Sequence, residues 1–358
     1  MGNTPRAVFD RSWRMALEPA AGGLYAVSST VSPSETPLRI RFMVQMTLTL
    51  AYWQATIDIY NLSASTANQM TSGAADVWKF RQPVITGDWV TLSAGYKPSA
   101  TGAFDADSNI IYTGQVLQPI WTREHVVDHV LRLRCITSLA DSALNQVAFS
   151  VEKGKTDLDA TNLICARCGI DADIDASSQV VMGESKYSRG QVIQGRPAEA
   201  MRQITRNNNL FSWINESGLH IRSFDQKSMA AVVAKFAYGT SQSDTSNVSA
   251  STPIKRTLIG TPQQTQEGIV FQVLMDPSVK IGDVVQLASG VLFAPFQFQY
   301  GKDYNVPASQ DGKYVVAGIQ HIGDSRGTGS DWVTEITGLT LNFFPDFLKT
   351  REVKSSGK

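Results

Sequence analysis

The sequence predicts a mainly β protein of the α+β kind, with two related antiparallel β-barrel domains on either side of a small α+β module. Three observations support this prediction. Residues 38–50 alternate apolar and polar side chains, as a strand with one buried face does. The motif G-D-x-V-x-L occurs twice, at Gly87–Leu92 and at Gly282–Leu287, each time ahead of a long two-strand segment. Between the two copies lie stretches with helical patterning.

The first unit begins with the alternating segment 38–50. A second alternating stretch, Ala55–Ile59, follows after a short break and is expected to pair back antiparallel. Ser63 is a suitable N-cap for a short polar helix over Ala64–Met70.

Three more strands are expected in this unit. The Gly87 motif opens one, and residues 110–121 and 126–137 form a hairpin. In its second strand Leu131, Leu133 and Cys135 share one face, so that face is expected to be buried. Residues 1–148 are therefore predicted to form the first barrel domain.

The middle module is predicted over residues 149–245. Asp157–Cys168 is expected to be a helix that ends at Gly169. A second helix starts at Pro197, where proline is tolerated, and Met201 and Ile204 form its apolar stripe. A hairpin over residues 210–221 completes the module.

The second unit is predicted over residues 246–345, with its two long strands at Tyr314–Ile322 and Trp332–Leu341, and residues 346–358 form a polar tail. Gly114 and Gly318 lie inside the leading strands of the two hairpins. The segment from the motif glycine to the strand glycine is nine residues longer in the second copy than in the first. The repeat indicates either a true duplication of a sheet unit or two uses of a common way to begin a hairpin.

Composition excludes several classes of function. The 358 residues include 32 Lys plus Arg and 32 Asp plus Glu, so no net charge attracts nucleic acid or an anionic membrane. No apolar run is long enough to span a membrane, and the N-terminus lacks the apolar core of a signal peptide. Three cysteines, an odd number without framework spacing, favour synthesis in a reducing compartment. We expect assembly in the cytoplasm of the producing cell.

Two motifs resemble metal or redox sites. Cys165 and Cys168 form a CxxC, but no second ligand pair accompanies them and they fall at a helix end, so buried packing is the better interpretation. His125 and His129 have helical metal-pair spacing but lie in and beside a hairpin turn. The two other histidines, His220 and His321, are single strand residues.

Two acidic segments, Asp105–Asn109 and Asp171–Asp175, resemble the start of a calcium loop. Both lack the glycine and the glutamate that such a loop requires at its sixth and twelfth positions. Motifs of serine hydrolases and phosphate-binding loops are not found in the sequence. The sequence therefore nominates no metal, no cofactor and no catalytic residue, and we expect the protein not to be an enzyme.

An aromatic segment, Val291–Tyr300, lies between the second G-D-x-V-x-L strand and its hairpin. Exposed aromatic side chains in a loop are typical of a partner interface, and the candidates here are Phe293, Phe296, Phe298 and Tyr300. The alternative is that the three phenylalanines cover the core of their own barrel.

The order of several short segments resembles the hub proteins of bacteriophage tail baseplates. The first tube-like domain of that family is similar to Ile59–Ser63, Gly87–Asp88, Ser93–Tyr96 and Ile111–Val116. The second is similar to Leu258–Pro262, Glu267–Ile269, Leu274–Pro277 and Val279–Leu287, and the module between them resembles Pro197–Ile221. The resemblance covers residues 38–340.

The resemblance implies a structural role in the virion, at the tail baseplate. It implies a homotrimer whose six tube-like domains surround a channel, with tail tube protein on the sixfold face and a spike or tip protein on the threefold face. Other baseplate proteins are further expected partners. DNA would pass through the channel without specific binding, for which a lining without strong positive charge is suited.

Two alternatives from other classes remain open. A cell-wall hydrolase of the tail tip would depend on an Asp or Glu and would lose activity when that residue is neutralised. A glycan-binding tail protein would stack sugars on exposed tryptophans, for which the candidates are Trp53, Trp78 and Trp89.

Overall fold

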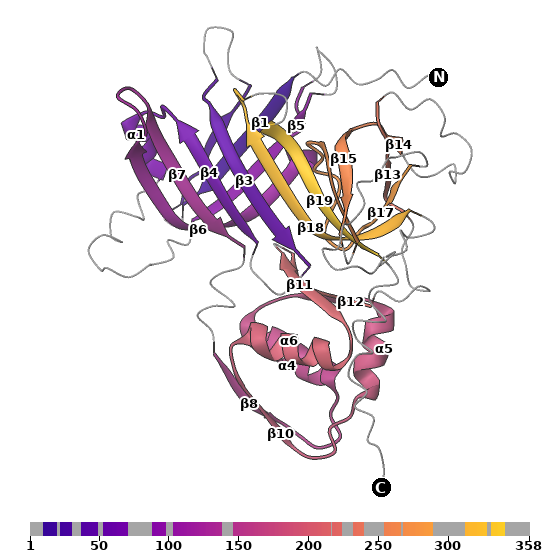
Figure 1. Ribbon diagram of the computed structural model, residues 1–358. Coiled ribbons are helices and arrows are strands. Elements are labelled where there is room, and N and C mark those ends of the chain that lie inside the picture. The colour runs from indigo at the N-terminus through magenta and orange to yellow at the C-terminus, as the bar shows by residue number, and fades with distance from the viewer. Residues whose placement is uncertain are drawn as a thin grey trace, which may run out of the picture.

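A large, strongly twisted sheet and a smaller α+β module make up the computed structural model of the protein (Figure 1). The expectation of a mainly β chain with an α+β module is confirmed. The structure describes residues 10–19, 22–30, 37–48, 53–70, 88–97, 103–137, 146–215, 217–223, 232–239, 254–265, 268–288, 312–327 and 331–340.

Seven strands of the large sheet come from the N-terminal part of the chain, in the order β3-β4-β7-β6-β5-β1-β2. They are β1 (Arg11–Glu18), β2 (Tyr25–Ser28), β3 (Ile40–Thr47), β4 (Gln54–Tyr60), β5 (Trp89–Tyr96), β6 (Ile110–Arg123) and β7 (His129–Ile136), with helix α1 (Ala64–Met70) after β4 and a 3-10 turn (Asp107–Asn109) before β6. β3 and β4 pair antiparallel as predicted, and the Ser63 hydroxyl accepts from the Thr66 amide at 3.1 Å, capping α1. Strands β1 and β2 were not predicted.

The described part of the middle module contains three helices and two small sheets. Its elements are β8 (Val147–Val151), α4 (Asp157–Cys168), β9 (Ala172–Ile174), α5 (Ala176–Glu184), β10 (Gln191–Gly195), α6 (Pro197–Asn207), β11 (Phe211–Asn215) and β12 (Gly218–Arg222). Helix α4 starts at a capping box between Thr156 and Asp159 and ends at Gly169, whose φ of 66° is the left-handed conformation that glycine favours. The module has a hydrophobic cluster of its own, while Trp213 of β11 instead packs into the core of the large sheet.

Seven further strands of the large sheet come from the C-terminal part, in the spatial order β15-β16-β19-β18-β17-β13-β14. They are β13 (Ala234–Phe236), β14 (Ile254–Lys255), β15 (Leu258–Gln264), β16 (Gly268–Leu274), β17 (Val284–Leu287), β18 (Lys313–Asp324) and β19 (Trp332–Thr340). This order repeats that of the first unit, with β15 in the place of β3 at one end and β14 in the place of β2 at the other. One difference is that β13 runs parallel to β17, whereas β1 runs antiparallel to β5.

Backbone hydrogen bonds show that the two units are built alike. The carbonyl of Asp88 accepts from the amide of Val116 at 2.9 Å, and the carbonyl of Asp283 accepts from the amide of Val316 at 2.8 Å. Directly after each valine the leading strand has a register shift against its hairpin partner, between Val116 and Gln118 and between Val316 and Gly318. The G-D-x-V-x-L motif therefore marks a structural repeat, and β5, β6 and β7 correspond to β17, β18 and β19.

The correspondence corrects the comparison of the two glycines. Val90 lies opposite Gly114, while the matching Val285 lies opposite Tyr314, so Gly318 corresponds to Gln118 and not to Gly114. Val116 follows Asp88 by 28 residues and Val316 follows Asp283 by 33, so the second copy is longer by five residues at this point, not nine.

Within the described residues, the two units share one continuous sheet of 14 strands. In the described part of the chain no unit closes into a barrel of its own, which differs from the expected pair of separate barrels. The units stay connected because β18 is longer than its partner β17. Its start pairs with β17, and its remaining residues continue past the end of β17 and pair with β3 of the first unit.

Candidate assembly interface

The place where the two units meet is the ladder between β18 and β3, here called the joint. It runs from Gly318 opposite Thr47 to Asp324 opposite Arg41. Leu48 donates its amide to the Ala317 carbonyl at 2.7 Å and Ser325 donates to the Ile40 carbonyl at 2.9 Å, extending the joint by one residue at each end. Because the joint links like units, it shows how one sheet unit of this kind docks against another.

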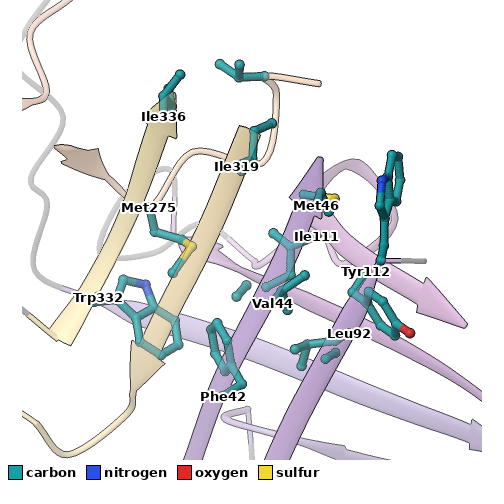
Figure 2. Packing of buried hydrophobic residues seen from close by; sticks show 14 of the residues in the cluster. Phe42, Val44, Met46, Leu92, Ile111, Tyr112, Met275, Ile319, Trp332 and Ile336 are labelled. Atoms are coloured by element: carbon teal, nitrogen blue, oxygen red, sulfur yellow. The ribbon is translucent and has the colours of Figure 1, made fainter. Parts of the chain in front are cut away.

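An aromatic pair packs beneath the joint (Figure 2). The rings of Phe42 on β3 and Trp332 on β19 meet edge to face, with centroids 5.3 Å apart, and both side chains are buried. Gly323 lies opposite Phe42 in the ladder, and a Cβ on this glycine would collide with the Phe42 ring. The joint therefore requires a residue without a side chain at position 323.

The first unit also holds Trp332 through β1 and β5. The Trp332 indole donates to the Gly95 carbonyl at 3.2 Å, and the Tyr96 hydroxyl donates to the Trp332 carbonyl at 3.3 Å. The guanidinium of Arg11 lies over the indole, 5.8 Å from its centroid. Burial raises the pKa of Tyr96 to about 12, so its hydroxyl keeps the proton that it donates.

Charged side chains form a row across the joint and the strands next to it. Arg39 binds the Asp324 carboxylate through Nε at 3.0 Å and Nη2 at 2.5 Å. One strand further, Asp58 is held between Arg41 at 2.9 Å and Arg132 at 2.7 Å. Opposite charges thus alternate across β18, β3, β4 and β7, which fixes the register of these strands.

His321 is buried inside the joint. Its Nδ1 lies 2.8 Å from the hydroxyl of Thr334, and burial lowers the pKa of the imidazole to about 3. The ring is therefore neutral at physiological pH. It serves the packing of the joint and does not carry a charge.

The β6–β7 hairpin, which corresponds to the β18–β19 hairpin, has an exposed end. The side chain of Trp121 is 43% exposed and stacks on His129, and Val126 and Val127 at the tip are 87% and 77% exposed. Apolar side chains gathered at one exposed tip are typical of a contact surface.

A comparison with family models matches residues 25–292 to the model described as baseplate hub gp41. The match covers most of the first unit, the middle module and the beginning of the second unit. The chain belongs to the baseplate hub gp41 family. It is therefore a structural component of a phage tail.

Solved structures agree with the fold of this baseplate hub protein. The 43 kDa tail protein of prophage MuSo2 from Shewanella oneidensis is 11% identical, with a TM-score of 0.52 over 93% of this chain and 99% of that one. A tail protein from Neisseria meningitidis MC58 is also 11% identical, with a TM-score of 0.53 over 93% and 98% of the two chains. A sequence comparison with curated proteins gives no match.

The hub protein's predicted partner residues, Phe293, Phe296, Phe298 and Tyr300, lie outside the described residues, as does the tail 346–358. The joint residues Phe42, Trp332 and Asp324 were not nominated from the sequence, since each is a common core or turn residue when read alone. Trp121 was not nominated either, because its match with His321 depends on the corrected alignment of the two units.

The cysteine and acidic motifs of the hub protein are structural. Cys165 and Cys168 are buried and are not joined in a disulfide, and burial raises the pKa of Cys165 to about 11, which keeps the thiol protonated. The Asp105 carboxylate accepts from the amides of Asp107 and Ser108 and so closes its own turn. Among the described residues, no cluster of His, Cys, Asp or Glu could hold a metal ion, and no helix has the length and apolar content to cross a membrane.

One group resembles a hydrolase triad that the sequence did not suggest. His220 lies with Nδ1 2.9 Å from the Asp173 carboxylate and Nε2 3.0 Å from the Ser217 hydroxyl. The side-chain amide oxygen Oδ1 of Asn215, however, lies 2.7 Å from that hydroxyl and 2.9 Å from Nε2. Both ring nitrogens therefore face acceptors and the hydroxyl donates to Asn215, so no base is positioned to activate the serine. The group closes the β11–β12 turn.

The tryptophans proposed for glycan stacking differ in position. Trp53 is buried and donates its indole N–H to the Thr47 carbonyl at 3.1 Å, so its ring cannot stack on a sugar. Trp89 is 38% exposed, and Trp78 lies outside the described residues. The described part of the hub protein thus favours neither the hydrolase nor the glycan-binding alternative.

Proposed function

We propose that the protein is the structural hub of the baseplate and that three copies form a ring with pseudo-sixfold symmetry. The observation behind this proposal is the pair of matching seven-strand units joined within one chain. Three chains with two such units each present six similar surfaces, which suits a sixfold tail tube. The loops that differ between the two units of a chain occur three times around the ring, which suits a threefold spike or tip.

In this arrangement neighbouring chains together complete the tube-like barrels. Residues 1–148 and 246–345 supply the tube-like domains and residues 149–245 a peripheral module, with 346–358 as a tail. The ring surrounds a channel through which DNA passes without specific binding, in line with the balanced charge of the chain. Tail tube protein, a spike or tip protein and other baseplate proteins are its partners, and assembly takes place in the host cytoplasm. No catalytic step is part of the proposal.

The ring is tested by native mass spectrometry and negative-stain imaging of the purified chain, alone and mixed with the tail tube protein of the same phage. We expect a trimer that appears as a threefold ring with a central pore and six similar lobes. A chain that stays monomeric in both conditions contradicts the proposed function.

We further propose that Phe293, Phe296, Phe298 and Tyr300 contact a partner protein. Replacing the three phenylalanines by serine should weaken assembly with tube or spike protein, because it removes large apolar contacts from an interface. The thermal unfolding of the isolated chain should change little. If the variant instead fails to fold, these residues belong to the core of their own domain and the proposal is wrong.

A further inference from the structure

We propose that His220 is held as an imidazolium ion and that its charge sets how firmly the middle module docks on the large sheet. The residues concerned, here called the turn cluster, are Asp173, Asn215, Ser217 and His220. The turn cluster lies within a single chain, so the inference does not depend on the proposed ring. It makes the attachment of the middle module sensitive to pH.

The first step fixes the orientation of the Asn215 side chain. Its Oδ1 atom lies 2.9 Å from the backbone nitrogen of Ser217, which donates to it. Because a backbone N–H can only donate, the oxygen of the amide and not its nitrogen faces Ser217. The same Oδ1 lies 2.9 Å from Nε2 of His220. Nε2 therefore faces an acceptor, and the contact is favourable only when Nε2 carries a proton.

The second step concerns the other nitrogen of the ring. Nδ1 of His220 lies 2.9 Å from a carboxylate oxygen of Asp173. Arg222 binds the same carboxylate, and its hydrogen bond is the largest of the effects that hold the pKa of Asp173 below the usual range. The carboxylate is therefore ionised at neutral pH and can only accept. Nδ1 has to donate as well.

Each neutral form of the ring would leave one repulsive contact. With the proton on Nδ1 alone, the lone pair of Nε2 faces Oδ1 of Asn215; with the proton on Nε2 alone, the lone pair of Nδ1 faces the Asp173 carboxylate. The imidazolium ion satisfies both contacts. Its ring also lies nearly parallel to that of Trp213, at 14° with the centroids 5.3 Å apart, and an aromatic face attracts a cation.

The charged groups on the elements packed around His220 are Asp171, Asp173, Arg222 and Lys280. The two carboxylates favour the imidazolium ion and the two cations oppose it. Arg222 is bound to the carboxylate that the ring contacts, while Lys280 donates to a main-chain carbonyl of the first unit. Since these four charges balance, the two hydrogen bonds of the ring decide its state.

Trp213 connects the turn cluster to the large sheet. Figure 1 shows β11, which carries this residue, at the end of the module next to the sheet. The indole ring stacks on His220 and its edge lies against Gly282 of the second G-D-x-V-x-L motif, where an added Cβ would be 2.9 Å from it. Of the described residues from β8 to β12, only Trp213 is among the buried side chains of the large-sheet core. A shift of the His220 ring therefore acts on the contact between module and sheet.

Loss of the ring proton should loosen this contact. Because the docked geometry favours the charged ring, the contribution of His220 to docking is present at low pH and is lost as pH rises and the ring becomes neutral. A neutral ring has to give up its contact with Asp173 or with Asn215, which moves it beneath Trp213. The module is then firmly docked in weakly acidic solution and more loosely docked in alkaline solution.

Nuclear magnetic resonance of the histidine rings in the full chain tests the protonation state. Of the four histidines, His125 and His129 are assigned with glutamine variants, and His321 stays neutral because burial lowers its pKa to about 3. The remaining signal belongs to His220. We expect both of its ring nitrogens to be protonated at pH 7, where a free histidine is mostly neutral. In Asp173→Asn the ring should be neutral at pH 7, because an amide can donate to Nδ1.

Hydrogen–deuterium exchange of the full chain measures the docking itself. Exchange in β11 and in residues 279–282, corrected for the intrinsic effect of pH, should be about tenfold faster at pH 9 than at pH 6, as expected for the loss of a hydrogen bond between charged groups. The control His125→Gln should behave like the wild type, since this histidine is exposed in the hairpin of the first unit. Asp173→Asn should show no such change with pH.

Three results would overturn the inference. They are a His220 ring with one unprotonated nitrogen at pH 7, exchange in the wild type that does not change with pH, and an Asp173→Asn variant that keeps the pH dependence of the wild type. If this variant does not fold, the two wild-type measurements still decide. None of these results depends on whether the chain forms a trimer, so the inference and the proposed function can fail separately.

Discussion

Replacing Trp332 by alanine should destabilise the protein by about 3–5 kcal/mol, the usual loss for a buried tryptophan. Trp332 has no measurable exposure and packs against Phe42, and its indole donates to the Gly95 carbonyl. Because these contacts join the two units, both should lose stability together. We expect one unfolding transition in urea, shifted to lower concentration, and a decrease in Tm of roughly 10 °C.

The matched control is Trp89→Ala, since Trp89 is 38% exposed and lies outside this contact. It should change the free energy of unfolding by about 1 kcal/mol or less. If Trp332→Ala lowers the stability of the C-terminal unit alone and a second transition appears, the two units fold independently. The joint would then be a contact between two independently folded domains and not part of a common core.

Replacing Asp58 by asparagine should cost about 2–3 kcal/mol at neutral pH, because two guanidinium groups lose the carboxylate they share. The Asp58 side chain is 4% exposed, while those of Arg41 and Arg132 are 42% and 37% exposed, so solvent offsets part of the loss. Asparagine keeps the volume of the side chain. Urea unfolding of the variant and the wild type at pH 7 measures the difference.

The same carboxylate gives this effect a pH dependence. Burial opposes ionisation of Asp58, but hydrogen bonds and charge from Arg132 and Arg41 outweigh it and hold the pKa below that of an aspartate in an unfolded chain. Its contribution is therefore complete above the unfolded pKa, near 4, and is lost as pH falls through the lower folded pKa. The difference between wild type and Asp58→Asn should shrink below pH 4. A difference that stays constant down to pH 2 would show that the carboxylate's charge is not its source.

Local patterns in the sequence predict most of the strands and helices. The alternation in residues 40–47, the proline that begins α6 and the glycine that ends α4 each act within a few residues. Strand β1 shows the limit of this approach. Trp13, Met15 and Leu17 alternate as a strand requires, but Met, Ala, Leu and Glu also favour helices, so the signal was ambiguous.

The joint could not be predicted in the same way. Periodicity tells which face of β3 and β18 is buried but not which strand lies at each edge, because backbone groups of any sequence can form the ladder. The need for glycine at position 323 becomes visible only when the Phe42 ring is placed opposite it. The motif repeat was visible in the sequence, yet its correct alignment depended on hydrogen bonds that the sequence does not display.

The joint also affects how the chain can fold during synthesis. Thr47 pairs with Gly318, 271 residues later, so the ribosome must add those residues before the ladder can start to form. At 5–20 residues per second this takes on the order of ten to fifty seconds. Throughout that time the outer edge of β3 has no partner from its own chain and can be captured by a strand of another nascent chain. Slow, long-range closure of this kind favours production at low temperature and low expression rate, where nascent chains meet less often.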